Sequence, residues 1–185
     1  MTTATGGIPT ARSIDHFALT VPNLDSAVEF FVNHLRAEVV YRTGPFSDEG
    51  TWMRDCLNVD RDATCLIAMI RLGEHTNLEL FEYTAPDQSQ TAPRNSDVGG
   101  THIAVYVDDL DAAVRYLQNV EGVVLQEGPN HVTDGSEVDG VHFCYFLTPW
   151  GQQMEVISTP DGMGYEKSTT ARMAPPPAAW RSSAR

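Results

Sequence analysis

Residues 15–31 read DHFALTVPNLDSAVEFF, and residues 101–117 read THIAVYVDDLDAAVRYL. Aligned without a gap, seven of these 17 positions are identical. An internal repeat of this kind indicates two copies of one structural unit, so it decides the architecture before any local pattern does. The identical pairs are His16/His102, Ala18/Ala104, Val21/Val107, Leu24/Leu110, Asp25/Asp111, Ala27/Ala113 and Val28/Val114. Most of these residues suit a core or a helix cap, whereas the repeated histidine needs a chemical explanation.

Each copy begins with a strand that runs into a helix. Residues 14–21 alternate between apolar and polar, as a half-buried strand does, and Pro22-Asn23 ends the pattern. The apolar residues that follow recur at helical spacing. Three strands are expected after each helix, at 38–42, 65–72 and 78–83 in the first copy and at 123–127, 141–147 and 153–158 in the second. Gly44-Pro45 is expected to form a turn. The sequence thus predicts the α+β class, with two tandem βαβββ modules that form a cupped mixed sheet.

Composition divides the chain further. The small, polar residues 1–12 predict a disordered N-terminus. Module one is expected at 13–86, a polar linker at 87–100 and module two at 101–158. The remaining residues, 159–185, form a Pro/Ala-rich tail that has too few apolar side chains to bury much surface alone.

Charge and cysteine content narrow the class of partner. The chain has 185 residues and a formal net charge of −13, so its field repels nucleic acid and anionic membranes. Lys167 is the only lysine, which favours a neutral polar substrate over a phosphate or CoA compound. Three cysteines without CxxC spacing suggest reduced thiols, and the N-terminus has no basic start followed by an apolar run. We therefore expect a cytoplasmic protein that binds neither nucleic acid nor membrane.

The last strand of each module carries a glutamate. Module one ends with NLELF at 77–81, and module two ends with QMEVI at 153–157. Alternation places each glutamate on the face opposite the more apolar residues, the same face that carries the repeated histidine. Two modules related by a pseudo-twofold axis would bring four side chains to one point: His16, Glu79, His102 and Glu155.

Two imidazoles and two carboxylates suit a divalent ion of intermediate hardness: Mn, Fe, Co, Ni or Zn. Four protein ligands leave two adjacent positions on a six-coordinate ion, which suit a carbonyl oxygen and its neighbouring hydroxyl. The ion would polarise the carbonyl as a Lewis acid, and a nearby carboxylate would move the α-proton. A single histidine or glutamate in a strand is more often a packing or surface residue, but such residues need not recur at matched positions.

The repeat, together with LELFE at 78–82 and GQQMEVIS at 151–158, resembles the vicinal oxygen chelate superfamily, which includes glyoxalase I, extradiol dioxygenases and bleomycin-binding proteins. The resemblance covers about residues 13–158. Within it, FFVNHLRAEVVYRTGPF, NLELFEYTAPDQ, PRNSDVGGTH and YFLTPWGQQMEV are similar to the cyclitol epimerases of the validamycin and cetoniacytone pathways. Those enzymes are metal-dependent and act on 2-epi-5-epi-valiolone, a neutral ketone with an adjacent hydroxyl.

The resemblance implies that the metal ligands of the superfamily fall on His16, Glu79, His102 and Glu155, and all four residue types match. A complete His-Glu-His-Glu set favours an isomerase or epimerase over an extradiol dioxygenase, which uses two histidines and one glutamate. By the same resemblance, Glu79 and Glu155 are the candidate catalytic bases. Glu82 is a poor candidate, because alternation places it on the other face of its strand.

Five further residues are candidate substrate contacts: Trp52, Phe81, Arg94, Asn95 and Tyr106. The aromatic residues either line the pocket or fill the core. The two polar residues precede module two, where they either donate hydrogen bonds to substrate hydroxyls or form a linker turn.

Three functions remain open on sequence grounds. The first is a metal-dependent epimerase that acts on a small polar carbonyl compound. The second is a glyoxalase I-like lyase or a metal-dependent dioxygenase of the same superfamily. The third is a non-enzymatic module that sequesters a small molecule and needs no stoichiometric metal. We also expect a homodimer, since the superfamily pairs such modules either within one chain or across a dimer.

Overall fold

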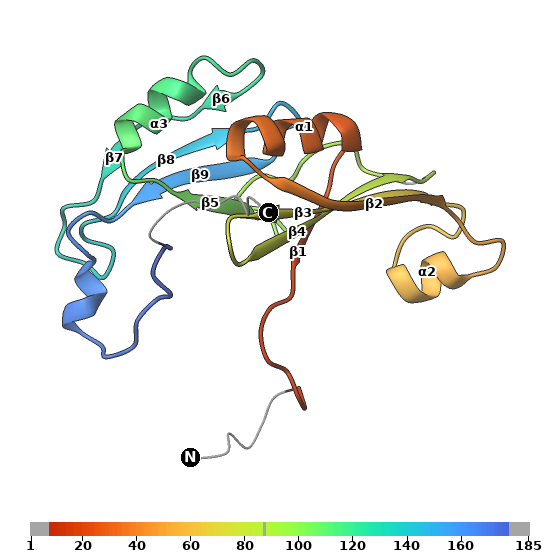
Figure 1. Ribbon diagram of the computed structural model, residues 1–185, viewed down its shortest axis with the longest axis horizontal. Coiled ribbons are helices and arrows are strands. Elements are labelled where there is room, and N and C mark those ends of the chain that lie inside the picture. Colours follow the sequence, from red (N-terminus) through yellow and green to blue (C-terminus); the bar gives the residue numbers. More distant parts are fainter. Residues whose placement is uncertain (1–7, 87, 178–185) are drawn as a thin grey trace. The chain divides into compact units, whose positions relative to one another are not determined.

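A computed structural model describes residues 8–86 and 88–177 of the chain (Figure 1). The contacts divide the described chain into two compact units. Unit 1 contains the described residues up to Gln88 together with Pro177, and unit 2 contains Ser89–Pro176. Each unit holds its own mixed sheet and one main helix, so the predicted α+β class is confirmed.

Parts of three predicted segments lie outside the described residues. These are residues 1–7 of the predicted N-terminal segment, residue 87 of the linker and residues 178–185 of the tail. Among the described residues, no helix has both the length and the apolar character needed to cross a membrane.

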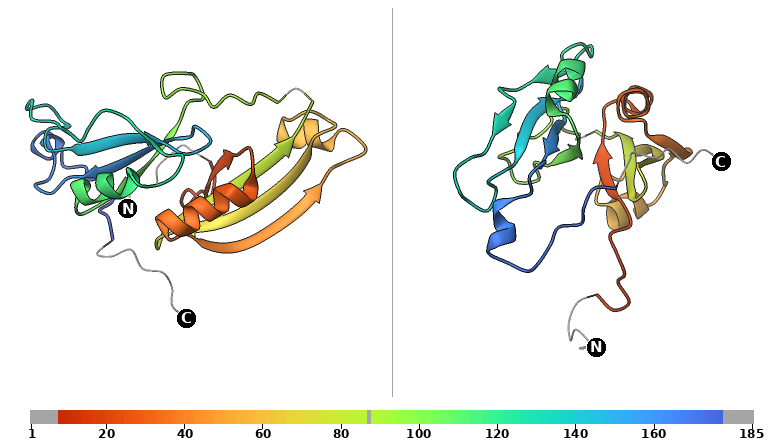
Figure 2. Two further views of the ribbon diagram at one scale, coloured as in Figure 1. Left: turned by 90° about the horizontal axis from the view of Figure 1, so that it is seen from above. Right: turned by 60° about the vertical axis from the view of Figure 1, so that its left-hand side comes forward.

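Unit 1 is a four-stranded sheet in the order β1-β4-β3-β2. Strand β1 runs parallel to β4, and the other neighbours are antiparallel. Helix α1 packs against β3 and β4 and crosses one face of the sheet (Figure 2). The elements of the unit are β1 (Phe17–Thr20), α1 (Leu24–Leu35), β2 (Glu38–Phe46), α2 (Trp52–Leu57), β3 (Thr64–Leu72) and β4 (Thr76–Thr84).

Helix α1 begins where two side chains satisfy its free backbone amides. Asn23 is the N-cap, and its Oδ1 accepts a hydrogen bond from the Ser26 amide at 2.8 Å. The second side chain is that of Glu82 on β4, whose carboxylate accepts a hydrogen bond from the Leu24 amide at 2.6 Å. Glu82 therefore ties the start of the helix to the sheet, on the face opposite Glu79 as alternation requires.

Alternation along β4 separates a core face from a half-open face. Leu78 and Leu80 are buried, whereas Asn77, Glu79 and Phe81 between and beside them are partly exposed. Because successive side chains of a strand point to opposite sides, burying the leucines leaves Glu79 on the face away from the core.

One local prediction in unit 1 was wrong. Gly44-Pro45 lies inside β2 and forms no turn, because the ladder shifts register between Thr43 and Phe46 and the strand continues beyond this irregularity. Gly44 has a φ of +100°, and a Cβ there would lie 2.6 Å from the Cys65 carbonyl oxygen, so this close approach requires glycine.

Helix α2 was not predicted at all. It has six residues and no side-chain cap, which is too short for a helical period to show in the sequence. It is anchored by Met53, which is fully buried in a cluster with Ala63 and Cys65.

Unit 2 repeats the order of unit 1 with a sheet of order β5-β9-β8-β6, and β7 pairs with β8 at the side. Strand β5 is parallel to β9, as β1 is to β4. The predicted strand at 123–127 is reduced to two paired residues. The elements of the unit are β5 (His102–Tyr106), α3 (Leu110–Leu117), β6 (Val124–Leu125), β7 (Asn130–His131), β8 (His142–Leu147), β9 (Gln153–Ser158) and η1 (Gly164–Lys167).

Candidate active site

Unit 1 brings one histidine and one glutamate together. His16 stands just before β1, and Glu79 lies in the middle of β4, where the parallel register pairs it with Ala18. The His16 Nε2 atom is 3.2 Å from Glu79 Oε2. On the other side of the ring, His16 Nδ1 is 2.8 Å from Asp15 Oδ1. Asn77 on β4 fixes the backbone next to His16, because its Nδ2 donates to the Asp15 carbonyl at 3.0 Å.

Unit 2 contains the same arrangement at the matched positions. The register pairs Glu155 on β9 with Ala104 on β5, and His102 Nε2 is 3.3 Å from Glu155 Oε2. The partner of His102 Nδ1 differs from that in unit 1, since it is the side-chain oxygen of Asn95 at 3.0 Å. The sequence repeat is thus a repeat of geometry, in which each histidine lies between two side-chain oxygens.

The two pairs differ in burial and in electrostatics. The Glu155 side chain is 8% exposed and the Glu79 side chain 16%. Burial raises the pKa of Glu155, and the neighbouring His102 partly opposes this shift. The hydrogen bond to Asp15 raises the pKa of His16, with a smaller contribution from Glu79 and an opposing one from desolvation.

The hydrogen-bond directions show what each pair can hold. When an oxygen acceptor faces Nδ1, a neutral imidazole carries its proton there and presents the Nε2 lone pair to the glutamate. Two groups that only accept hydrogen bonds attract one another only through a positive charge between them, which is either a proton or a metal ion. Imidazole nitrogen and carboxylate oxygen are the donor types that intermediate divalent ions prefer. Each pair therefore fits a metal ion.

Within neither unit do three or more His, Cys, Asp or Glu side chains of the described residues gather into a metal-binding group. Each unit contributes a pair only.

A pocket of about 710 Å³ lies beside the pair of unit 2. Tyr145 connects the two, because it lines the pocket, faces Glu155 across the β8–β9 ladder and packs edge-on against His102 at 5.4 Å between ring centroids. Burial raises the pKa of Tyr145, as does the charge of Glu155, so the phenol is neutral at physiological pH. The pocket is lined by Thr91, Ala92, Pro93, Arg94, Asn95, Ser96, Gln126, Tyr145, Leu147, Trp150, Gly151 and Gln153.

The polar groups of this pocket are mostly uncharged. Gln126 donates from Nε2 to Gln153 Oε1 at 3.2 Å, so two amides lie together on the wall. Arg94 is the only cation among the described lining residues, and Asp97 pairs with it through contacts of 2.9 Å and 3.4 Å. The pocket therefore presents mainly uncharged hydrogen-bonding groups, and Asp97 balances the charge of Arg94.

The remaining predicted substrate contacts lie elsewhere in their units. Phe81 stacks on Tyr83 at 5.3 Å and packs against the Met53 cluster. Tyr106 ends β5, partly buried, opposite Ile157. Trp52 begins α2 with 48% of its surface exposed. Of the five predicted contacts, Arg94 and Asn95 are the two that line the described pocket beside His102 and Glu155.

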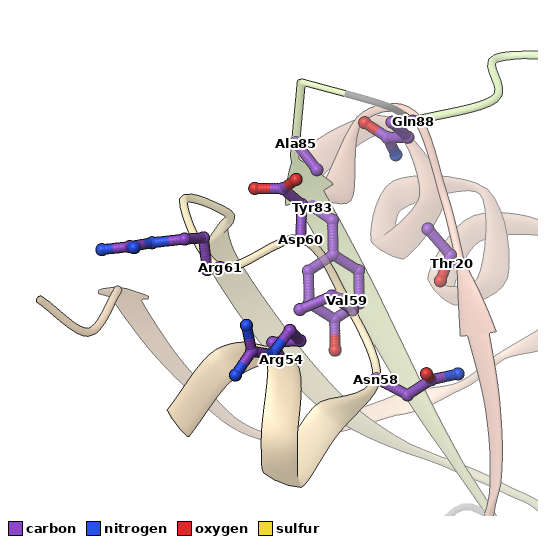
Figure 3. Close-up of a pocket in the computed structure, with 9 residues that line it drawn as sticks. All are labelled: Thr20, Arg54, Asn58, Val59, Asp60, Arg61, Tyr83, Ala85 and Gln88. Atoms are coloured by element: carbon purple, nitrogen blue, oxygen red, sulfur yellow. The ribbon is translucent and has the colours of Figure 1, made fainter. Parts of the chain in front are cut away.

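A second pocket, of about 630 Å³, lies at the α2 end of unit 1 (Figure 3). Figure 3 shows Arg54 on α2, with Asp60 and Arg61 on the segment that follows it and Tyr83 projecting from β4. Both arginines pair with the next residue in the chain, Arg54 with Asp55 at 2.8 Å and Arg61 with Asp62 at 3.3 Å. Both pairs are exposed to solvent and are therefore weak. Its lining is Thr20, Arg54, Asn58, Val59, Asp60, Arg61, Tyr83, Ala85 and Gln88.

Apart from Arg94 and Asn95, the lining of the unit 2 pocket was not predicted from the sequence, and this includes the polar residues Gln126, Tyr145 and Gln153. The register of β8 on β9 decides that Tyr145 faces Glu155, and a single sequence does not reveal that register. Asp15 was also missed, although its place next to the repeated histidine was a usable signal.

Residues 15–145 match the model of a family described as the Glyoxalase/Bleomycin resistance protein/Dioxygenase superfamily. A protein of Actinomyces named 2-epi-5-epi-valiolone epimerase is 49% identical over 174 residues, which is 94% of each chain.

Two solved structures show the same fold at low identity. A glyoxalase family protein from Bacillus cereus is 19% identical with a TM-score of 0.64, over 85% of this chain and 98% of its own. A fosfomycin resistance protein from Listeria monocytogenes, solved with Mn(II) and sulfate, is 12% identical with a TM-score of 0.53, over 86% of this chain and 99% of its own.

Proposed function

Because the chain belongs to the Glyoxalase/Bleomycin resistance protein/Dioxygenase superfamily, we propose that it is a metal-dependent epimerase of a cyclitol ketone such as 2-epi-5-epi-valiolone. The observation that carries this proposal is the relative of that name, which matches at 49% identity over nearly the whole chain. The repeated His–Glu pair supports it independently, because it supplies both metal ligands and bases for proton transfer.

We propose that the two pairs hold one divalent ion through His16, Glu79, His102 and Glu155. The imidazole and carboxylate donors suit Mn, Fe, Co, Ni or Zn. When bound, such an ion supplies Lewis-acid polarisation of the substrate carbonyl, which acidifies the neighbouring C–H bond.

The two glutamates would carry out the proton transfer. Inversion at a carbon next to a carbonyl requires that a proton leaves one face and returns to the other. Two carboxylates from the two repeats provide one base and one acid for this exchange, and Glu79 and Glu155 are the pair at equivalent positions. Burial of Glu155 keeps bulk water away from the carboxylate that exchanges the proton.

The unit 2 pocket supports a neutral polyhydroxylated substrate. Its amides and phenol donate and accept hydrogen bonds, which suits several hydroxyl groups. Arg94 is the one cation among the described lining residues, and Asp97 balances its charge, so the pocket offers little positive charge for a phosphate or carboxylate. A glutathione or CoA conjugate would need such a charge.

Deuterium incorporation tests the reaction directly. The metal-loaded protein is incubated with 2-epi-5-epi-valiolone in D₂O, and the product is examined by NMR and mass spectrometry. We expect one deuterium at a carbon beside the ketone, together with the second epimer. A metal-loaded protein that leaves this compound undeuterated would contradict the proposed substrate.

We also propose a homodimer. The outer strand β2 leaves one backbone edge unpaired in the described sheet and carries three exposed apolar side chains: Val39, Val40 and Tyr41. Proteins seldom leave such an edge uncovered. Sedimentation equilibrium should give twice the chain mass of 20.3 kDa, and a single-chain mass would contradict the dimer.

A further inference from the structure

Asn95 reaches His102 from a tightly built turn that precedes β5. The Arg94 amide donates to Asp97 Oδ2 at 2.8 Å, and the Asp97 amide donates back to the Arg94 carbonyl at 3.0 Å. The Gly100 amide then donates to the Asp97 carbonyl at 2.7 Å. These bonds form a compact turn over residues 94–100 and fix the backbone position of Asn95.

The turn closes only around glycine. A Cβ on Gly100 would lie 2.2 Å from the Arg94 carbonyl oxygen and 2.8 Å from that of Asp97. Both neighbours are backbone atoms, so the clash is relieved only if the turn opens. Gly99, before it, has a φ of +90°, which side chains other than hydrogen rarely allow.

We propose that Asn95 is a positioning residue that fixes the tautomer of His102. Its Oδ1 lies 3.0 Å from Nδ1 and accepts the ring proton there, in competition with Glu155, whose carboxylate oxygen lies 3.3 Å from Nε2 and accepts the proton in the other tautomer. With the proton on Nδ1, the lone pair is on Nε2. For catalysis the proposal rests on the proposed function, because the lone pair must be free on the side where a metal ion would bind. A hydrogen-bond acceptor at the other ring nitrogen fixes the ring orientation of a metal-binding histidine, and losing that acceptor lowers the affinity for metal.

The comparison with unit 1 explains why the residue is an amide. The equivalent partner of His16 is Asp15, a carboxylate whose side chain is 88% exposed and therefore well screened by solvent. In unit 2, Asn95 is exposed as well, but Glu155 is more buried than Glu79, so a second carboxylate beside His102 would add repulsion to a charge that is already poorly solvated. A neutral amide accepts the same hydrogen bond without that charge.

The tautomer is measured on metal-free protein by ¹⁵N–¹H correlation of the imidazole rings at a pH where histidine is neutral, with His102→Gln to assign the signal. We expect the Nδ1–H form for wild type. Asn95→Leu removes the acceptor and should give a mixture of tautomers, and Gly100→Ala should do the same by moving the turn. Asn95→Asp should restore the Nδ1–H form.

The matched control is Asn119→Leu, which deletes an exposed amide after α3 whose Nδ2 donates to the Arg115 carbonyl. It should leave the His102 signal unchanged. An Nε2–H tautomer in wild type, or an unchanged signal in folded Asn95→Leu protein, would overturn the proposal.

Metal affinity is the second measurement, with Co(II) added to metal-free protein and followed by its visible absorption. Asn95→Leu should weaken binding about 10- to 100-fold, and Asn95→Asp should recover most of the loss. Equal affinity of wild type and Asn95→Leu overturns the positioning role. Failure of wild type to bind Co(II) overturns instead the proposed metal site, and the tautomer result then decides on Asn95 alone.

Discussion

At the scale of single residues, the proposed proton transfer depends on the carboxylates of Glu79 and Glu155. Replacing either with Gln keeps the shape but removes the basic oxygen, so we expect the rate of deuterium incorporation to fall about 100-fold or more. Glu82→Gln is the matched control, because Glu82 caps α1 and faces away from Glu79. That variant should keep its activity. Full activity in Glu79→Gln or Glu155→Gln would exclude the residue as a base.

The three cysteines should differ sharply in reactivity. Cys56 is exposed on α2, whereas Cys65 and Cys144 are buried, and burial raises the pKa of both buried thiols. Only thiolates react quickly with a disulfide reagent. At pH 8 we expect one fast thiol in the native protein and three in denaturant. Three fast thiols without denaturant would contradict the packing.

Cys65 also predicts a loss of stability at alkaline pH. Burial raises the pKa of its thiol to about 11, against about 8.5 in an unfolded chain. A raised acid pKa favours the folded state below the unfolded value and loses this contribution as the pH rises toward 11. The melting temperature of wild type should therefore fall across this range. Cys65→Ala should show a shallower fall, and an identical slope would contradict the argument.

Candidate site residues could be picked out from the sequence where the chain repeats itself. The His–Glu positions emerged because a matched recurrence has no explanation in packing alone. The contact from Asn95 to His102 could not be predicted, because it depends on how the turn at 94–100 closes. Reading Asn95 as a substrate contact therefore overlooked its hydrogen bond to the imidazole.

At the scale of elements, N-cap side chains stabilise the starts of the two main helices. Asn23 caps α1, and Asp109 caps α3 by accepting from the Ala112 amide at 2.8 Å. Asn23→Ala and Asp109→Ala should each lower the free energy of unfolding by about 1 kcal/mol in urea titrations. The substitutions Asn23→Asp and Asp109→Asn keep an acceptor oxygen, so they should change the free energy of unfolding little. No loss in the alanine variants would show that the caps contribute nothing.

Helices with a regular apolar pattern could be predicted from the sequence, whereas short or irregular elements could not. Helices α1 and α3 show a cap followed by an apolar stripe, which is a strong local signal. Strand β2 continues through Gly44-Pro45 because β3 supplies its partner atoms, and α2 forms because Met53 finds a buried cluster. Both depend on contacts distant in the sequence, which override local preference.

At the scale of the whole molecule, the proposed metal site depends on the duplication. One repeat holds one imidazole and one carboxylate, which is half of the proposed ligand set. The proposed site therefore needs both repeats for a single ion. A site confined to one repeat would instead survive changes in the other.

Isothermal titration of metal-free protein with Mn(II) or Co(II) tests this claim most directly. We predict one ion per chain for wild type and loss of that binding in both His16→Ala and His102→Ala. Two ions per chain, or an unchanged affinity in either variant, would contradict a shared site.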